Sequence, residues 1–196
     1  MKPAFRFDAD YYGRYYRDAR TRVSDRAETT RLARFVAGYL GYLQQPVRNI
    51  IDLGCGLGQL RGPFLRAFPG ASYLGVELSD YACARYGFTQ GSVVDFKHRS
   101  RFDLVLCRGV LQYLTTHEAQ RALDNLARLC RGCLYLEALT SEDWANNADQ
   151  KRTDGAVYLR PARFYRKRLA GHFQAAGGGI FVHERSPAVL YALESL

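Results

Sequence analysis

The feature that most constrains the fold is an apolar run that passes directly into a glycine-rich loop. Residues 47–53 are almost continuously apolar, and residues 52–58 read Asp-Leu-Gly-Cys-Gly-Leu-Gly. Such a run is typical of a strand buried on both faces of a parallel sheet. A predicted helix, residues 59–67, follows at once. Because glycines let a ligand approach the backbone at a helix N-terminus, this arrangement predicts a ligand site.

The rest of the chain alternates predicted strands and helices. Further strands are predicted at residues 72–76, 89–94, 102–107, 134–139, 180–182 and 188–193. Further helices are predicted at residues 8–45, 79–85, 115–130 and 161–175, with a loop at residues 140–159. This alternation indicates a doubly wound α/β fold, in which ligands bind beyond the carboxyl ends of the strands.

Composition narrows the class of protein. Apolar residues make up 47% of the 196 residues, which suits one globular core. No apolar run approaches the roughly 18 residues that span a bilayer, and the first residues lack the apolar segment of a signal peptide. We therefore expect a cytoplasmic protein without a membrane partner. The five cysteines include a lone C-x-x-C pair, Cys130 and Cys133, for which we expect neither metal nor disulfide.

The spacing of the glycines separates classes of nucleotide loop. A dinucleotide-binding loop has the pattern G-x-G-x-x-G. In this chain Gly54 and Gly56 are followed by Gly58, so the third glycine arrives one residue early. A phosphate-binding P-loop is excluded because no G-K-[ST] follows.

Residues 50–58 resemble, almost position for position, the first motif of the class I S-adenosylmethionine-dependent methyltransferases. In that family the loop cradles the methionine and ribose parts of S-adenosyl-L-methionine. The resemblance implies backbone contacts from Gly54, Cys55 and Gly56. It also implies that Asp52 orients the amino end of the cofactor.

Later segments resemble further motifs of that family, in order. Residues 73–77 resemble the second strand, which implies that Glu77 accepts both ribose hydroxyls, with Leu78 beside it. Residues 91–95 resemble the third strand, which implies that Asp95 accepts the adenine amine, with Phe96 beside it. Taken singly, Glu77 is equally a helix-capping acid and Asp95 a turn residue. Their order at successive strand ends favours the cofactor site.

Residues 102–107 resemble the fourth strand, which ends at Cys107 beneath the methyl-donor sulfur. The resemblance covers residues 47–139. It implies a seven-stranded, mostly parallel sheet with helices on both faces and the last strand antiparallel. We expect a methyltransferase domain at residues 47–196 and an N-terminal helical segment at residues 1–46 that acts as a lid or only packs.

The methyl acceptor is less constrained. Methyl transfer needs alignment and exclusion of water more than a fixed catalytic residue, so no catalytic residue is assigned. The candidates for the acceptor pocket are Tyr11, Tyr15, Arg108, Tyr113, Trp144 and Arg160. Arg108 would hold a carboxylate or phosphate, or else pair with an acid or face solvent. Trp144 is equally plausible as a core residue.

Charge leaves the acceptor open. The net charge is +9, and basic residues cluster in residues 1–50 and 151–168. We expect a methyltransferase acting on a small molecule, with an acidic molecule as one candidate acceptor. The alternatives are a nucleic-acid or protein methyltransferase that docks through these basic patches, or a non-catalytic cofactor-binding subunit. In the nucleic-acid alternative, the N-terminal tyrosines would stack on bases, and Arg14, Arg17, Arg20 and Arg22 would contact phosphates. The D/N-P-P-Y/F signature of exocyclic-amine nucleic-acid methyltransferases is absent after residue 107.

Overall fold

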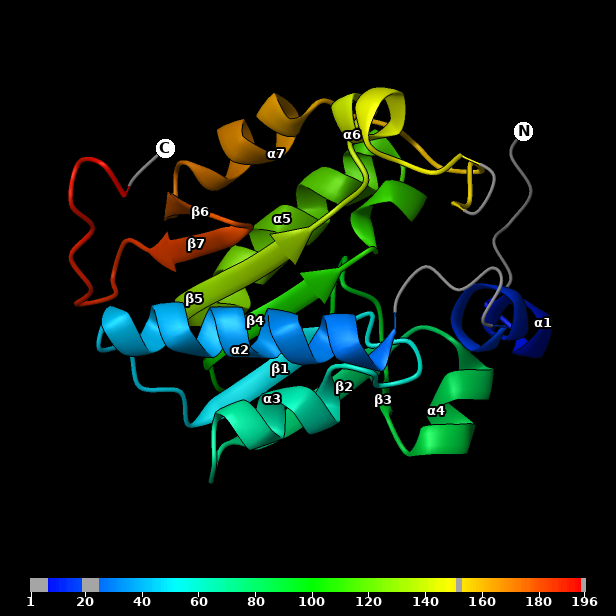
Figure 1. Cartoon of the computed structure of the whole chain (residues 1–196), viewed down its shortest axis with the longest axis horizontal. Helices are drawn as coiled ribbons and strands as arrows, with labels where there is room; N and C mark the ends of the chain where they lie inside the picture. The colour runs from blue at the N-terminus through cyan, green and yellow to red at the C-terminus, as the bar shows by residue number, and fades with distance from the viewer. Residues whose placement is uncertain (1–6, 19–24, 151–152, 195–196) are drawn as a thin grey trace.

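The computed structural model describes residues 7–18, 25–150 and 153–194. These residues form a seven-stranded sheet in the order β3-β2-β1-β4-β5-β7-β6 (Figure 1). The strands are β1 Asn49–Leu53, β2 Ser72–Glu77, β3 Thr89–Gln90, β4 Phe102–Arg108, β5 Cys130–Glu137, β6 Phe173–Gly177 and β7 Ile180–His183. Only β7 runs antiparallel to its neighbours, so the predicted sheet is confirmed.

Helices cover both faces of this sheet (Figure 1). They are α1 Ala9–Tyr12, α2 Arg26–Tyr42, α3 Arg61–Ala67, α4 Asp80–Tyr86, α5 Thr116–Leu129, α6 Ser141–Asn146 and α7 Ala162–Leu169, with a π-helical turn η1 at Gly13–Arg17 and a 3-10 turn η2 at Leu111–Tyr113. The helices α2 and α3 pack on one face, and α5 and α7 on the other. No helix among the described residues is long and apolar enough to cross a membrane.

Alternate side chains of the central strands pack into two apolar cores, one on each face of the sheet. On β1, Ile50 packs with α2 and α3, whereas Ile51 packs with α5 and α7. On β4, Leu104 and Val105 divide in the same way. Because both faces are covered, these strands carry apolar residues at consecutive positions, which explains the apolar runs in the sequence.

The N-terminal half differs from the single helix predicted at residues 8–45. The segment α1–η1 ends at Arg17, and α2 begins afresh at Arg26. The side chain of Asp25 accepts a hydrogen bond of 2.8 Å from the backbone N–H of Glu28, which fixes the start of α2. Asp18 is extended, with φ −67° and ψ 116°, so the chain leaves the helical conformation there.

The C-terminal part also differs from the prediction. The helix predicted to reach Ala175 ends at Leu169, and residues 173–177 form β6 instead. Gly177, Gly178 and Gly179 all have positive φ and form the turn of the β6–β7 hairpin. The strand predicted at residues 188–193 is therefore wrong, because β6 takes the place beside β7. The predicted loop at residues 140–159 contains α6, which is capped reciprocally by Thr140 and Asp143.

Candidate cofactor and acceptor site

The glycine-rich loop leaves β1 in a conformation that needs glycine. Gly54 has φ +78° and Gly56 has φ +55°, values at which any other residue is strained. The N–H groups of Gly54 and Cys55 both donate to the carbonyl oxygen of Val76, at 2.8 and 3.1 Å. The loop is thereby fixed against the end of β2 before any ligand binds.

Glu77 ends β2 and is 5% exposed. Its Oε2 accepts the N–H of Gly56 at 2.7 Å, and its Oε1 accepts the N–H groups of Leu78 and Ser79 at 2.8 and 3.0 Å. A carboxylate offers about four acceptor positions, so one remains for a ligand hydroxyl. The side chain of Ser79, not that of Glu77, caps α4, so the simple capping interpretation of Glu77 is excluded.

Asp52 lies one position before the end of β1 and is 1% exposed. The hydroxyl of Tyr73 donates to its carboxylate. Burial raises the pKa of Asp52 from 3.8 to about 7, against the opposing effects of the Tyr73 hydrogen bond and of Arg108. Asp52 therefore changes charge near neutral pH.

A small cavity of about 70 Å³ lies over the loop. It is lined by Gly54, Gly56, Glu77, Leu78, Ser92 and Val93, and by Tyr12 and Tyr16 from the N-terminal segment. A Cβ placed at Gly56 would lie 3.6 Å from the ring of Tyr12 and 3.7 Å from that of Tyr16. The two rings therefore cover the bare backbone of the loop.

The other residues predicted for the cofactor are divided among this cavity, the protein surface and the core. Leu78 lines the small cavity and is 55% exposed. Asp95 lines neither cavity described here; its side chain is 64% exposed and pairs with Arg121 at 4.0 Å. Phe96 packs against the core, and Cys107 is completely buried in it. Ser92 takes the place beside the cavity that sequence analysis gave to Asp95.

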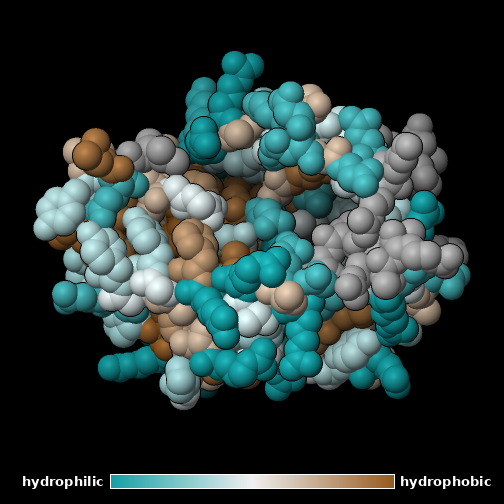
Figure 2. Space-filling view, in the orientation of Figure 1, coloured by the Kyte–Doolittle hydropathy of each residue, from teal (hydrophilic) through white to brown (hydrophobic). Residues whose placement is uncertain are grey.

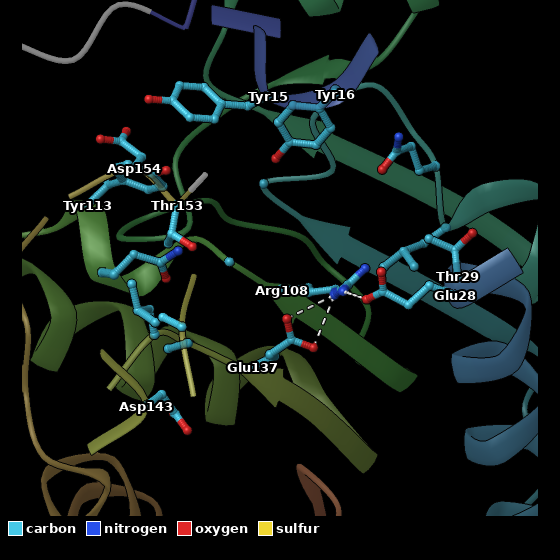
Figure 3. A pocket seen from close by; sticks show the side chains of 18 of the residues that line it. Tyr15, Tyr16, Glu28, Thr29, Arg108, Tyr113, Glu137, Asp143, Thr153 and Asp154 are labelled. Atoms are coloured by element: carbon cyan, nitrogen blue, oxygen red, sulfur yellow. Dashed lines mark hydrogen bonds and ion pairs between the residues drawn. The ribbon is translucent and has the colours of Figure 1, made fainter. Parts of the chain in front are cut away.

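A second cavity, of about 820 Å³, opens at the carboxyl ends of β4 and β5, where Figure 2 shows the surface hollowed. Figure 3 shows its labelled side chains, which come from η1, α2, β4, β5, η2, α6 and the segment after α6, with Arg108 pointing toward Glu28 and Glu137. The two cavities share their walls at Tyr11, Tyr16, Gly54, Arg108, Gly109 and Tyr113. A group bound over the glycine-rich loop thus faces whatever occupies the larger cavity.

Arg108 lies at the wall that the two cavities share, but it is already paired with acids. Its Nε donates to both carboxylate oxygens of Glu137, at 3.0 and 3.1 Å, and its Nη2 donates to Glu28 (Figure 3). Burial alone lowers the pKa of Arg108, but the charges of Glu137 and Glu28 hold it above its ordinary value. Of the alternatives for Arg108, the structure supports pairing with an acid.

Tyr11, Tyr15 and Tyr113 all line the larger cavity, as predicted. The hydroxyl oxygens of Tyr11 and Tyr113 lie 2.9 Å apart. Burial raises the pKa of Tyr113 above its usual range, and the charge of Asp154 raises it further. These contacts connect the N-terminal segment to η2.

The N-terminal segment also packs against α4. Tyr12 stacks on Tyr81 with 6.1 Å between ring centroids, and Arg17 donates to the hydroxyls of Tyr81 and Tyr86, each at 2.9 Å. The alternatives of lid and packing element are therefore both compatible with this position. Arg20 and Arg22 lie outside the described residues.

Arg160, another candidate for the acceptor pocket, lines neither cavity. It is 4% exposed, and its guanidinium donates to the carbonyl oxygens of Leu111 at 3.1 Å, Tyr158 at 3.2 Å and Leu114. This buried cation holds the η2 turn, which in turn positions Tyr113. Trp144 lines neither cavity and lies against Gly155, so it serves packing.

Among the residues that line the larger cavity and were not selected from the sequence are Glu28, Gln112, Glu137 and Asp154. One signal for Glu137 was present, because an acid there interrupts the apolar run 134–139 at a strand end. Its partner Arg108 is its direct neighbour in the β4–β5 register. The others come from segments whose path over the sheet has no sequence signature.

Comparisons with known proteins agree with this architecture. Residues 51–132 match the family model described as a methyltransferase domain. The trans-aconitate 2-methyltransferase of Deinococcus radiodurans is 30% identical over 114 residues, a match that spans 53% of this chain and 43% of that protein's length. Residues 51–132 of this chain therefore carry a methyltransferase domain. The family resemblance seen in the sequence is therefore confirmed.

Solved structures of this methyltransferase family share the fold. The sugar N-methyltransferase KedS8 from a Streptoalloteichus species has a TM-score of 0.64 at 19% identity, over 95% of this chain and 96% of that one. The amino pentose methyltransferase CalS10 from Micromonospora echinaspora, solved with S-adenosylmethionine bound, has a TM-score of 0.63 at 18% identity, over 95% and 99%. At these identities the likeness shows the fold alone. S-Adenosylmethionine is the cofactor of the family.

Proposed function

We propose that this methyltransferase transfers the methyl group of S-adenosylmethionine to a small molecule held in the larger cavity. The observation that carries the proposal is the wall shared by the two cavities, which includes Gly54, Arg108 and Tyr113. A volume of about 820 Å³ lies in the range of small-molecule pockets. We propose residues 47–196 as the transferase domain.

The residues around the glycine-rich loop fit this cofactor. The positive-φ glycines leave the backbone bare, and Glu77 keeps one acceptor position for a ribose hydroxyl. We assign Asp52 to the amino group of the cofactor, and Leu78 and Ser92 to its adenosyl part. When bound, S-adenosylmethionine supplies an electrophilic methyl group whose bond to sulfur breaks as its bond to the acceptor forms.

The protein's own contribution is alignment and exclusion of water. The small cavity, at about 70 Å³, is below the roughly 300 Å³ usual for ligand pockets, because the N-terminal tyrosines cover the loop. We assign this segment, within residues 1–46, the role of a lid that opens for the cofactor and closes over it. Its contacts to Tyr113 and Tyr81 then close both cavities together.

A screen with methyl-labelled S-adenosylmethionine tests this function. Small molecules, tRNA and a mixture of purified proteins are offered separately as acceptors. The proposal expects label in small molecules only. Label confined to tRNA or protein would contradict it and would favour docking through the basic patches.

A further inference from the structure

The larger cavity has the opposite charge to the molecule as a whole. The chain carries a net charge of +9. Seven acids line the cavity: Asp25, Glu28, Asp52, Glu137, Asp143, Asp149 and Asp154. Among the described residues that line it, Arg108 is the only lysine or arginine. A cavity with this lining attracts cations and disfavours anions.

The arrangement of Arg108 strengthens this asymmetry. Glu28 and Glu137 both bind its guanidinium, so the three side chains together carry a net negative charge (Figure 3). A carboxylate acceptor that approached Arg108 would meet the charges of these two acids beside it. The acidic acceptor considered from the sequence therefore finds no support in this cavity.

Gln112 gives an independent indication of the ligand. It lines the cavity on η2, is 8% exposed, and its Oε1 is buried without a hydrogen-bond partner among the described residues. A buried acceptor left unpaired costs about 1–3 kcal/mol. A carbonyl oxygen accepts only, so the missing partner is a hydrogen-bond donor.

We propose that the acceptor presents a protonated amine to this cavity, and that the amine nitrogen receives the methyl group. The inference rests on the methyltransferase function proposed above. An ammonium offers only donors and a positive charge, which matches the carboxylates and the Gln112 carbonyl oxygen. Asp154 lines the larger cavity beside Tyr113, which lies in the wall of both cavities. We assign the carboxylate of Asp154 to the ammonium.

The proton balance gives the carboxylates a second role. An ammonium nitrogen has no lone pair, so it first gives one proton to a lining carboxylate. The neutral amine then forms the nitrogen–carbon bond while the carbon–sulfur bond breaks, and the positive charge of the sulfonium passes to the nitrogen. The carboxylate releases its proton to solvent, leaving a methylammonium product and S-adenosylhomocysteine.

Two matched panels of acceptors test the inference. The amines are glucosamine, cadaverine, spermidine and phenethylamine; the acids are glucuronate, glutarate, trans-aconitate and phenylpropionate. Each compound is titrated into the complex with S-adenosylhomocysteine by calorimetry and offered with labelled cofactor. We expect binding and N-methylation within the amine panel only. Methylation of an acid, or no binding by any amine, overturns the inference, whereas failure of S-adenosylhomocysteine to bind overturns the proposed function itself.

Variants of nearly the same shape test whether the side chains of Asp154 and Gln112 bind the amine. D154N is expected to raise the KM of the best amine about tenfold with S-adenosylhomocysteine affinity unchanged, and Q112L to raise it in the same direction. Q112L also serves as the test if D154N does not fold. E184Q, an exposed acid after β7, makes the same chemical change outside the cavity and should have no effect. An unchanged KM in the folded cavity variants would contradict the inference.

Discussion

Glu77 connects the glycine-rich loop to the end of β2. Its carboxylate accepts three backbone N–H groups, including that of Gly56, yet faces the small cavity. The carboxylate that fixes the loop therefore also lines the cavity that we assign to the cofactor. Neutralising it weakens each of its hydrogen bonds, because charged acceptors bind more strongly than neutral ones.

E77Q is expected to weaken the binding of S-adenosylhomocysteine at least tenfold, since the amide replaces one acceptor oxygen by a donor. Calorimetry measures the affinity, and thermal unfolding reports any change in the loop. D95N is the matched control and should change the affinity less than twofold, because Asp95 faces Arg121 outside the cavities. Equal losses of affinity in both variants would indicate that Asp95 binds the adenine of the cofactor.

Asp52 predicts a pH dependence of stability. Its pKa is raised to about 7 in the folded protein from 3.8, mainly by burial, so the folded state holds a proton that the unfolded state has lost. The free energy of unfolding should therefore fall as pH rises from about 4 to 7. Comparing the wild type with D52N by urea unfolding isolates this contribution. A difference between them that does not change with pH would contradict it.

Asp103 predicts the opposite pH dependence of the free energy of unfolding, which the same urea unfolding experiment can measure. Although burial alone raises its pKa, the hydrogen bonds from Arg131 and from the backbone of Arg48 lower it. Its contribution should be present above its unfolded pKa and be lost as the pH falls. D103N should therefore have a lower free energy of unfolding than the wild type at neutral pH, and this difference should shrink as the pH falls toward about 3.

Among the elements, the η2 turn depends on a buried cation that comes from far along the chain. Arg160 donates to the carbonyl oxygens of Leu111 and Leu114, at the two ends of the turn that carries Gln112 and Tyr113. Burying a guanidinium is tolerated here because its donors find acceptors. Arg160 thus sets the wall of the larger cavity without lining the cavity itself.

R160K keeps the charge but cannot reach all of these carbonyl oxygens, so we expect a loss of about 2–4 kcal/mol in the free energy of unfolding. R168K is the control, because Arg168 binds Asp124 at the surface, where such pairs contribute at most about 1 kcal/mol. Urea unfolding measures both. A loss in R160K no larger than that in R168K would show that the η2 turn does not depend on Arg160.

The elements themselves were largely predictable. The strands β1, β2 and β4 and the helix α5 follow from apolar runs and a capping box, both of which are local signals. The hairpin β6–β7 does not follow from local signals. Ala175 and Ala176 have the composition of a helix, and only pairing with β7 makes them a strand. The break after Arg17 was also missed, because Asp25 was not recognised as the residue that caps α2.

At the scale of the whole molecule, charge is separated between surface and cavity. The sequence singled out the residues that we assign to the cofactor, Asp52–Gly56 and Glu77, because they lie in motifs at successive strand ends. The acceptor side could not, since it assembles α2, β5, η2 and the segment after α6 around a single Arg108. The net charge left an acidic molecule among the candidate acceptors, whereas the described residues that line the larger cavity include more acids than bases.

Titration of S-adenosylmethionine, S-adenosylhomocysteine and NAD into the purified protein by calorimetry tests the central claim most directly. The structure predicts one site that binds both S-adenosyl compounds and is weakened at least tenfold in E77Q, with no binding of NAD. Binding of NAD without either S-adenosyl compound would contradict the assignment of the glycine-rich loop.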